Sequence, residues 1–210
     1  MELDLAQMTS QERYRLLVAS VIPRPIAFVT TLDENGVTNL APFSYFNVIT
    51  SRPALISISI GQREWQGKRQ KKDTLKNIEA TGQFVINLAV EGLLAAVNDA
   101  SADYPPGVSE IEALKLTTVA SAKVRPPRIH ESPVHLECEL SRVIMLGDEP
   151  QVGLVIGEVV HYHADPSVVD AATKLPVAER LRPLARMGGA EYAGLGEIFV
   201  QARPVLPGHD

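Results

Sequence analysis

Alternating apolar and polar positions along the chain predict a protein built mainly from β-strands. The alternation is clearest over residues 54–60, where Ile56, Ile58 and Ile60 form one apolar face and Ser57 and Ser59 lie on the other. Similar patterns predict further strands over residues 26–31, 37–40, 82–88, 134–140 and 152–163. We therefore expect at least six strands.

Turn residues and short helical patterns indicate how these strands connect. Asn35-Gly36 predicts a hairpin between residues 26–31 and 37–40, because both residues tolerate a positive φ. Residues 147–150 (GDEP) predict a turn between the two long strands near the C-terminus. Helical patterns cover a segment capped by Ser10 and stopped by Pro23, and residues 73–80, 91–98, 109–114 and 177–184. Because no βαβ rhythm is visible, we expect an antiparallel barrel, mainly β with short helices, in a single domain over residues 1–210.

Composition and charge argue against several kinds of partner and indicate a cellular compartment. The 210 residues include 20 Lys and Arg against 25 Asp and Glu, and the net charge of −5 argues against a nucleic-acid-binding protein. No apolar run reaches the roughly 20 residues of a membrane span, and the acidic N-terminus does not resemble a signal peptide. The single Cys138 excludes an internal disulfide framework and suits a reducing compartment. We expect a cytoplasmic protein without a membrane partner.

Familiar catalytic motifs are missing from the sequence. It contains no glycine-rich dinucleotide loop after a strand, no Walker loop and no Gly-x-Ser-x-Gly elbow. Cys138 lies in the middle of a predicted strand, so we interpret it as a small buried apolar residue. His161 and His163 share one strand face and could bind a metal, but solvated histidines at a strand end are the favoured interpretation. We predict neither a catalytic side chain nor a metal site.

A basic run precedes one predicted helix. Arg63, Lys68, Arg69, Lys71 and Lys72 lie just before or at the start of residues 73–80. A solvated loop explains such a run. A phosphate site explains it equally well, because a helix N-terminus offers free N–H groups and the positive end of the helix dipole. In that arrangement the Asp73 side chain caps the helix amides and does not face the anion.

Six ordered segments resemble the flavin reductase family of FMN-binding split barrels. The matching segments are residues 23–31 (PRPIAFVTT), 36–46 (GVTNLAPFSYF), 72–74 (KDT) with 77–78 (NI), 127–138 (PRIHESPVHLEC), 157–160 (GEVV) and 185–189 (ARMGG). The resemblance runs from about Tyr14 to about Tyr192. It implies a homodimeric antiparallel split β-barrel that holds FMN near the subunit interface and receives electrons from NADH, NADPH or a partner. Flavoredoxin-like proteins and the reductase components of monooxygenases are the most similar in character.

The resemblance also implies a set of FMN-binding residues. Small residues around a proline at 39–44 predict a loop whose main-chain amides donate hydrogen bonds to the flavin ring. The face that carries Ser57 and Ser59 leaves room for the ring or ribityl chain, although a strand facing water would look the same. Arg186 could reach the flavin or be a surface arginine, and Trp65 is left outside the site. The full expected set is Thr30, Asn39, Leu40, Ala41, Pro42, Phe43, Ser44, Ser57, Ile58, Ser59, Arg69, Lys72, Asp73, Thr74 and Arg186.

Three functions are compatible with these residues. The first is an oxidoreductase that passes hydride or electrons from NAD(P)H to flavin or to a downstream acceptor such as a monooxygenase component, with the chemistry carried by the flavin. The second is an FMN-containing electron carrier that is reduced by a protein donor. The third is a non-catalytic protein that binds FMN or another phosphate-bearing ligand. The sequence does not choose between NADH and NADPH.

Overall fold

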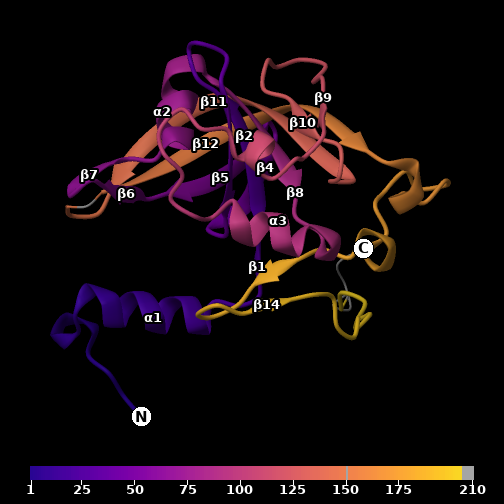
Figure 1. Cartoon of the computed structure of the whole chain (residues 1–210). Coiled ribbons are helices and arrows are strands. Elements are labelled where there is room, and N and C mark those ends of the chain that lie inside the picture. Colours follow the sequence, from indigo (N-terminus) through magenta and orange to yellow (C-terminus); the bar gives the residue numbers. More distant parts are fainter. Residues whose placement is uncertain (150, 205–210) are drawn as a thin grey trace.

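A curved antiparallel sheet of seven strands forms the body of the protein (Figure 1). This computed structural model describes residues 1–149 and 151–204. From one edge to the other the strands are β3 (Thr38–Phe43), β2 (Ala27–Leu32), β8 (Gln83–Leu88), β11 (Val134–Leu146), β12 (Val152–Ala164), β5 (Ala54–Ile60) and β4 (Phe46–Ser51). The mainly β, antiparallel prediction is thus confirmed.

The sheet curls without closing into a barrel. Strand β3 contacts β5 across the interior, but the two edge strands β3 and β4 do not pair with each other in the described part of the chain. Strands β11 and β12 form a long hairpin whose register contains bulges, and bulges strengthen the local twist of a strand. Gly157 on β12 lets the sheet bend closely, because a side chain there would collide with the Phe84 ring.

Strand β2 separates two hydrophobic clusters. Its residues Ala27 and Val29 pack with Ile56, Ile58 and Ile60, and helix α2 (Asp73–Thr81) covers this cluster. Its residue Phe28 packs on the opposite side, in a cluster that includes α3 (Leu94–Asp99). A strand that is buried on both faces has consecutive apolar residues in its sequence, and residues 26–29 show this pattern.

Several predicted boundaries move in the structure. Helix α1 (Ser10–Ser20) is capped by Thr9, which forms a capping box with Glu12, so Ser10 is the first helical residue and not the cap. The predicted helix 91–98 is a 3₁₀ turn, η2 (Glu91–Leu93), followed by α3, and the predicted helices near 109–114 and 177–184 shrink to α4 (Glu110–Ala113) and α5 (Ala178–Leu181). The predicted turn at 147–150 includes Pro150, which lies outside the described residues.

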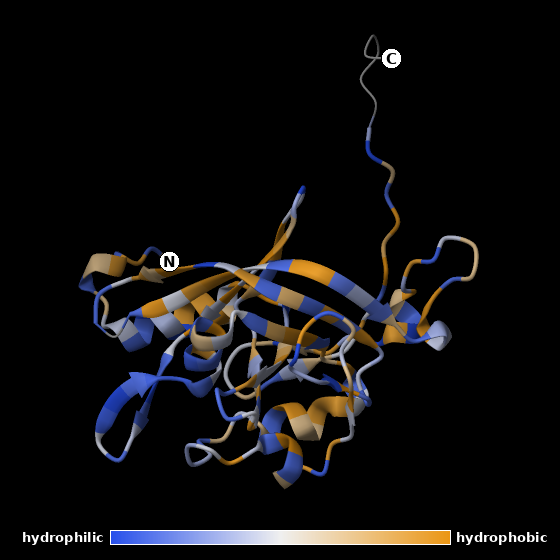
Figure 2. Cartoon of the chain, turned by 90° about the horizontal axis from the view of Figure 1, so that it is seen from above, coloured by the Kyte–Doolittle hydropathy of each residue, from blue (hydrophilic) through white to orange (hydrophobic). Residues whose placement is uncertain are grey.

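Short elements surround the sheet. They are η1 (Leu5–Gln7), η3 (Pro166–Val168), β1 (Arg24–Pro25), β13 (Ala185–Arg186), β14 (Tyr192–Ala193), β9 (Thr118–Val119), β10 (Arg128–Ile129), β6 (Gln62–Trp65) and β7 (Lys68–Lys71). Strands β6 and β7 form a hydrophilic hairpin that projects from the sheet (Figure 2). The basic run is therefore mostly a β-hairpin and not a loop.

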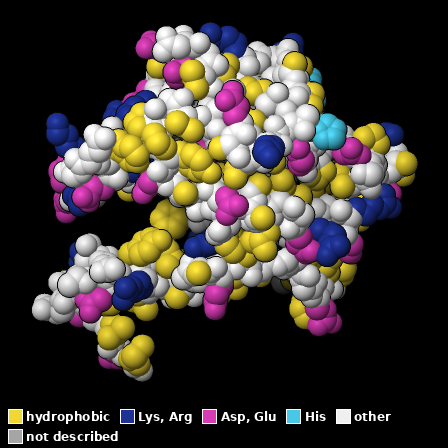
Figure 3. All heavy atoms as spheres, viewed as in Figure 1, with side chains coloured by type: hydrophobic (Ala, Val, Ile, Leu, Met, Phe, Trp, Pro, Cys, Tyr) yellow, Lys and Arg dark blue, Asp and Glu magenta, His cyan; other side chains and the backbone are white. Residues whose placement is uncertain are grey.

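Helix α1 lies apart from the sheet and is held through Arg24. The buried guanidinium of Arg24 donates to the carbonyl oxygens of Val18, Val21 and Met187, and it thereby joins α1 to the segment after β13. Figure 3 shows a hollow between α1 and the sheet, with hydrophobic side chains on both sides. Within the described residues, no helix has the length and apolar character needed to cross a membrane.

Candidate functional site

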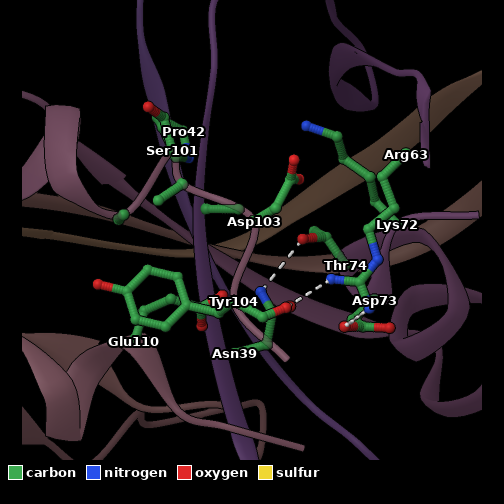
Figure 4. A pocket seen from close by; sticks show the side chains of 13 residues that line it. Asn39, Pro42, Arg63, Lys72, Asp73, Thr74, Ser101, Asp103, Tyr104 and Glu110 are labelled. Carbon is green, nitrogen blue, oxygen red and sulfur yellow. Dashed lines mark hydrogen bonds and ion pairs between the residues drawn. The ribbon is translucent and has the colours of Figure 1, made fainter. Parts of the chain in front are cut away.

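Three neighbouring pockets follow the edge strand β3 and its continuation to Ser44. The first, which we call the polar pocket, lies between β3, the start of α2 and the segment after α3 (Figure 4). Its cavity is about 60 Å³. It is lined by Asn39, Ala41, Pro42, Arg63, Lys72, Asp73, Thr74, Ala100, Ser101, Ala102, Asp103, Tyr104 and Glu110.

Arg63 is the most deeply placed cation of the polar pocket. Its side chain is only 8% exposed, and its Nη1 donates to the Tyr104 carbonyl at 2.9 Å. Its Nη2 lies 2.9 Å from Asp73 Oδ2 as an ion pair. Nevertheless, neither Nη2 nor Nε makes a hydrogen bond of acceptable geometry to any described residue. Buried nitrogen atoms without such bonds are costly, and this pattern is typical of a site that awaits an acceptor.

The start of helix α2 contributes a second cation and free amides. Lys72 is the N-cap residue and makes no side-chain cap. Burial lowers the pKa of Lys72, and the nearby Asp103 carboxylate opposes that shift. The Lys72 carbonyl accepts its first helical hydrogen bond from the Leu75 amide. The two amides before it, those of Asp73 and Thr74, therefore have no main-chain acceptor and are free donors at the start of the helix. Thr74 Oγ1 accepts a hydrogen bond from Asn39 Nδ2 at 3.1 Å.

Carboxylates balance these cations. Asp73 forms ion pairs with Arg63 and with Lys76, so it does not cap the helix amides as the sequence suggested. It occupies the first helical position, whereas the capping position belongs to Lys72. Glu110 is buried, and its Oε2 accepts a hydrogen bond from the Leu40 amide at 2.8 Å. Burial raises the pKa of Glu110 despite this hydrogen bond.

The second pocket, the apolar pocket, is larger and lies between α1 and the sheet. Its cavity is about 460 Å³. It is lined by Leu17, Val21, Pro23, Arg24, Pro25, Ser44, Tyr45, Phe46, Asn47, Ser57 and Ser59. The predicted alternation of β5 is confirmed, because Ile56, Ile58 and Ile60 are buried whereas Ser57 and Ser59 face this pocket.

The third pocket, the middle pocket, joins the other two. Its cavity is about 200 Å³, and it shares Pro42 and Ser101 with the polar pocket and Ser44 with the apolar pocket. Its remaining lining residues are Ile26, Val97, Asn98, Arg186 and Tyr192. The three pockets therefore form one groove that is polar and charged at one end and apolar at the other.

Most predicted site residues line this groove. In the polar pocket they are Asn39, Ala41, Pro42, Lys72, Asp73 and Thr74; in the other two pockets they are Pro42, Ser44, Ser57, Ser59 and Arg186. The side chains of Thr30, Leu40, Phe43 and Ile58 are instead buried in the protein interior. The Thr30 hydroxyl accepts a hydrogen bond from Asn87 Nδ2, which explains its burial.

The structure differs from the sequence prediction in two local details. Residues 39–43 are not a loop but most of edge strand β3, and a proline is tolerated there because an edge strand needs fewer main-chain donors. The Leu40 amide is already bonded to Glu110, and Pro42 has no N–H, so neither can donate to a ligand ring. Arg69 is exposed on β7 opposite Glu64, and it does not line the polar pocket, whose arginine is Arg63.

The histidines at the end of β12 also differ from expectation. His163 is not simply solvated, because its Nε2 contacts the buried carboxylate of Glu137 on the neighbouring strand. Glu137 also accepts hydrogen bonds from the amides of Ala122 and Lys123. Burial raises the pKa of Glu137, but these hydrogen bonds outweigh it and lower the pKa to about 2. Cys138 is buried as predicted, and burial raises the pKa of its thiol.

Comparison with known proteins places the chain in a family. Residues 19–184 match the family model described as flavin reductase like domain. The chain belongs to the flavin reductase family. This membership confirms the resemblance found in the sequence and supports a flavin cofactor.

Solved structures agree with this family. Nitrilotriacetate monooxygenase component B from Bacillus cereus superposes with a TM-score of 0.89 and 38% identity, covering 96% of this chain and 98% of that one. The 2-nitrobenzoate 2-nitroreductase NbaA of Pseudomonas fluorescens gives a TM-score of 0.87 and 30% identity, covering 99% and 98%. A split-barrel protein from Shewanella frigidimarina gives 0.81 at 21% identity over 97% and 100%, and this likeness concerns the fold alone.

Proposed function

We propose that this member of the flavin reductase family binds FMN along the groove and transfers electrons from NADH or NADPH to flavin or to a downstream acceptor. The observation that carries the proposal is the continuity of the three pockets. A polar end that holds Arg63 and Lys72, a middle and an apolar end follow one another along β3. FMN has the same polarity, with a phosphate at one end and a largely apolar ring at the other.

The polar pocket fits a phosphate group. The buried Nε of Arg63 has no hydrogen-bond acceptor among the described residues, and Nη2 has only its ion pair with Asp73. Phosphate oxygens would supply further acceptors. The Lys72 ammonium and the free amides of Asp73 and Thr74 add further donors at a helix N-terminus. Because the cavity of this pocket is only about 60 Å³, we favour the single phosphate of FMN over the diphosphate of FAD.

The protein's own residues bind and orient, and no side chain has to act as an acid or base. Bound FMN would supply the hydride and electron chemistry. Ser44, Ser57 and Ser59 offer hydroxyls along the wall of the groove, and the small size of these side chains leaves space for a flat ring. Cys138 takes no part, because it is buried in the sheet and its thiol stays protonated.

The apolar pocket leads us to propose a homodimer. Leu17, Val21, Tyr45 and Val48 are exposed around α1 and β4, which is an unusual concentration of apolar surface. A second copy of the chain would cover this surface and complete the wall of the groove. The similarity to a monooxygenase component B supports a monooxygenase, or another electron-transfer protein, as the physiological acceptor.

Flavin binding and anaerobic reduction test the proposal. We expect the purified protein to bind FMN more tightly than riboflavin, and the visible absorption of the complex to bleach on addition of NADH or NADPH. Bleaching by a reduced ferredoxin-like protein but by neither nicotinamide would favour the electron carrier. Failure to bind any flavin would contradict the proposal and favour a different phosphate-bearing ligand.

A further inference from the structure

An exposed apolar segment follows the last strand of the chain. Residues 194–204, which we call the C-terminal arm, come after β14 and belong to no helix or strand. The arm makes no main-chain hydrogen bond to any described residue. Phe199 and Val200 are 82% and 94% exposed, and Leu195 and Ile198 are exposed as well. Figure 2 shows the arm running away from the body of the protein.

The composition of the arm favours an extended strand. Residues 198–200 (IFV) combine two β-branched residues with an aromatic one, and both kinds are enriched in strands. The beginning of the arm is fixed on its own protomer, because Gly194 lies directly against the Glu91 side chain. Phe199 and Val200 lie beyond this contact and are almost fully exposed. A strand-forming run that is exposed and unpaired favours pairing with another chain.

The two edges of the seven-stranded sheet differ in how well they are protected. Edge strand β3 is covered, because α2, α3 and α4 contact it, and it contains Pro42, which has no N–H to pair. Edge strand β4 contains neither proline nor a charged residue. Its residues Val48 and Ile49 are 69% and 50% exposed. The open edge of the sheet is therefore β4.

The outer side of β4 can accept another strand. In the described part of the chain β4 pairs with β5 alone. The Val48 amide donates to the side-chain oxygen Oδ1 of its neighbour Asn47 at 2.8 Å, an exposed contact that a carbonyl of an added strand can replace. A bulge between Val48 and Thr50 hinders pairing farther along, but residues 46–48 keep a regular register with β5.

A second copy of the chain supplies both of these surfaces. Fully extended, the arm spans up to about 36 Å, which is about twice the roughly 17 Å radius of gyration of a domain of this length. In a two-fold dimer each copy donates one arm and receives the other, so the exchange closes on itself. Val48 also belongs to the apolar surface around α1 and β4 that supports the homodimer.

We propose that the C-terminal arm of each protomer adds a strand to β4 of a second copy, with Phe199 or Val200 beside Val48. In such strand addition, main-chain hydrogen bonds supply affinity and alternate side chains supply specificity. The inference rests on the proposed homodimer and goes beyond it, because it names the segment that is exchanged and the strand that receives it. It does not depend on the flavin.

Cross-linking between two co-expressed variants tests the exchange. One chain carries Val48→Cys and the other carries Phe199→Cys or Val200→Cys, with tags of different size that identify mixed products on a gel. Because neighbouring strand positions face opposite sides, one of the two arm variants presents its thiol to β4. Cys138 is buried with a raised thiol pKa, so it does not compete for a short bismaleimide. Leu175→Cys, at an apolar position that is 64% exposed, replaces the arm variant as the control.

We expect a mixed cross-linked dimer between Val48→Cys and an arm variant, and none with Leu175→Cys. Dominant cross-linking of Val48→Cys to itself would overturn the proposal, because the two β4 edges would then pair directly. Absence of the mixed product from a protein that sediments as a dimer would also overturn it. So would a cross-link formed only within one chain that carries both cysteines, because the arm would then fold back on its own β4.

Sedimentation equilibrium measures what the arm contributes to the dimer. The double variant Phe199→Ser with Val200→Ser should weaken dimer formation at least about a hundredfold, because each dimer loses four apolar side chains from its interface. Leu175→Ser should leave it unchanged, and circular dichroism verifies that each variant is folded. An unchanged dimer in the double variant would contradict the exchange. A monomeric native protein would remove the homodimer and the exchanged arm together, whereas FMN titration decides the flavin function separately.

Discussion

Two groups of charged side chains lie inside this protein, one around Glu137 and one around Arg63. The carboxylate of Glu137 is completely buried, and both of its oxygens accept hydrogen bonds, from the amides of Ala122 and Lys123 and from His163. The guanidinium of Arg63 is almost as buried and pairs with Asp73, yet its Nε has no hydrogen-bond partner among the described residues and its Nη2 has only that ion pair.

The difference separates a structural charge from a functional one. A buried charge whose partners all come from the protein stabilises the fold, because removing it leaves those partners unsatisfied. A buried charge with too few partners costs stability in the free protein, and a ligand that supplies the missing acceptors removes the cost. Substitutions in the Glu137 group should therefore change stability, whereas substitutions in the polar pocket should change ligand affinity.

The largest effect is expected for Glu137→Gln. The amide has only one oxygen, so at least one of the bonded N–H groups of Ala122 and Lys123 loses its acceptor. We expect the free energy of unfolding to fall by about 3 kcal/mol, with little change in the FMN affinity of the folded protein. Urea denaturation and FMN titration measure the two quantities. Glu139→Gln, at an exposed position on the same strand, should change stability by no more than about 0.5 kcal/mol.

Acid should remove the same stabilisation. Glu137 has a pKa of about 2 in the folded protein against an ordinary value of 4.5. A lowered pKa means that the stabilisation is complete above the unfolded pKa and is lost as the pH falls from about 4.5 through about 2. We expect a loss on the order of 3 kcal/mol across this window. Urea midpoints of the native protein should fall as the pH is lowered through this window. An equally steep fall in Glu137→Gln would show that Glu137 is not the group responsible.

Lys72→Gln should change FMN affinity and leave stability nearly unchanged, in contrast to Glu137→Gln. Loss of one charge-assisted contact of about 1.5–3 kcal/mol should weaken FMN binding by roughly ten- to a hundredfold. Riboflavin, which has no phosphate, should bind equally well to both forms. Stability should change little, because burial already disfavours the charged form of Lys72.

Arg69→Gln is the matched control for this variant. Arg69 is exposed on the hairpin, so its replacement should leave FMN affinity unchanged. If Arg69→Gln weakened FMN binding as much as Lys72→Gln does, the phosphate would lie outside the polar pocket.

Arg69 also shows what the sequence could and could not predict. The period of two along β5 was sufficient to separate buried Ile56 and Ile58 from Ser57 and Ser59 in the groove, because that pattern is local. The hairpin β6–β7 went unrecognised, although Gln66 and Gly67 both adopt a positive φ at its turn. In its register Arg69 pairs with Glu64 and therefore faces away from Arg63. Recognising that turn would have identified Arg63 as the arginine that lines the polar pocket.

Other parts of the site had no local signal. Glu110, Ser101 and Asp103 reach the polar pocket from segments far along the chain, and nothing in their own surroundings predicts the contact. No local pattern predicts the contact between Glu137 and His163 either, because they lie on two different strands and form a cross-strand hydrogen bond. The proline at 42 suggested a loop, and only the position of β3 at the sheet edge makes a strand possible there.

The smallest effect is expected for Glu110→Gln. Unlike Glu137→Gln, this substitution should raise the free energy of unfolding. Burial raises the pKa of Glu110, so the folded state disfavours its charged form, and stability falls as the pH rises through the folded pKa. The amide oxygen can still accept from the Leu40 amide. We expect a gain of up to about 1 kcal/mol near pH 7 and none near pH 4, measured by urea denaturation, with exposed Glu112→Gln as the control. A loss as large as that of Glu137→Gln would mean that the polar pocket, too, is held together by its own charges.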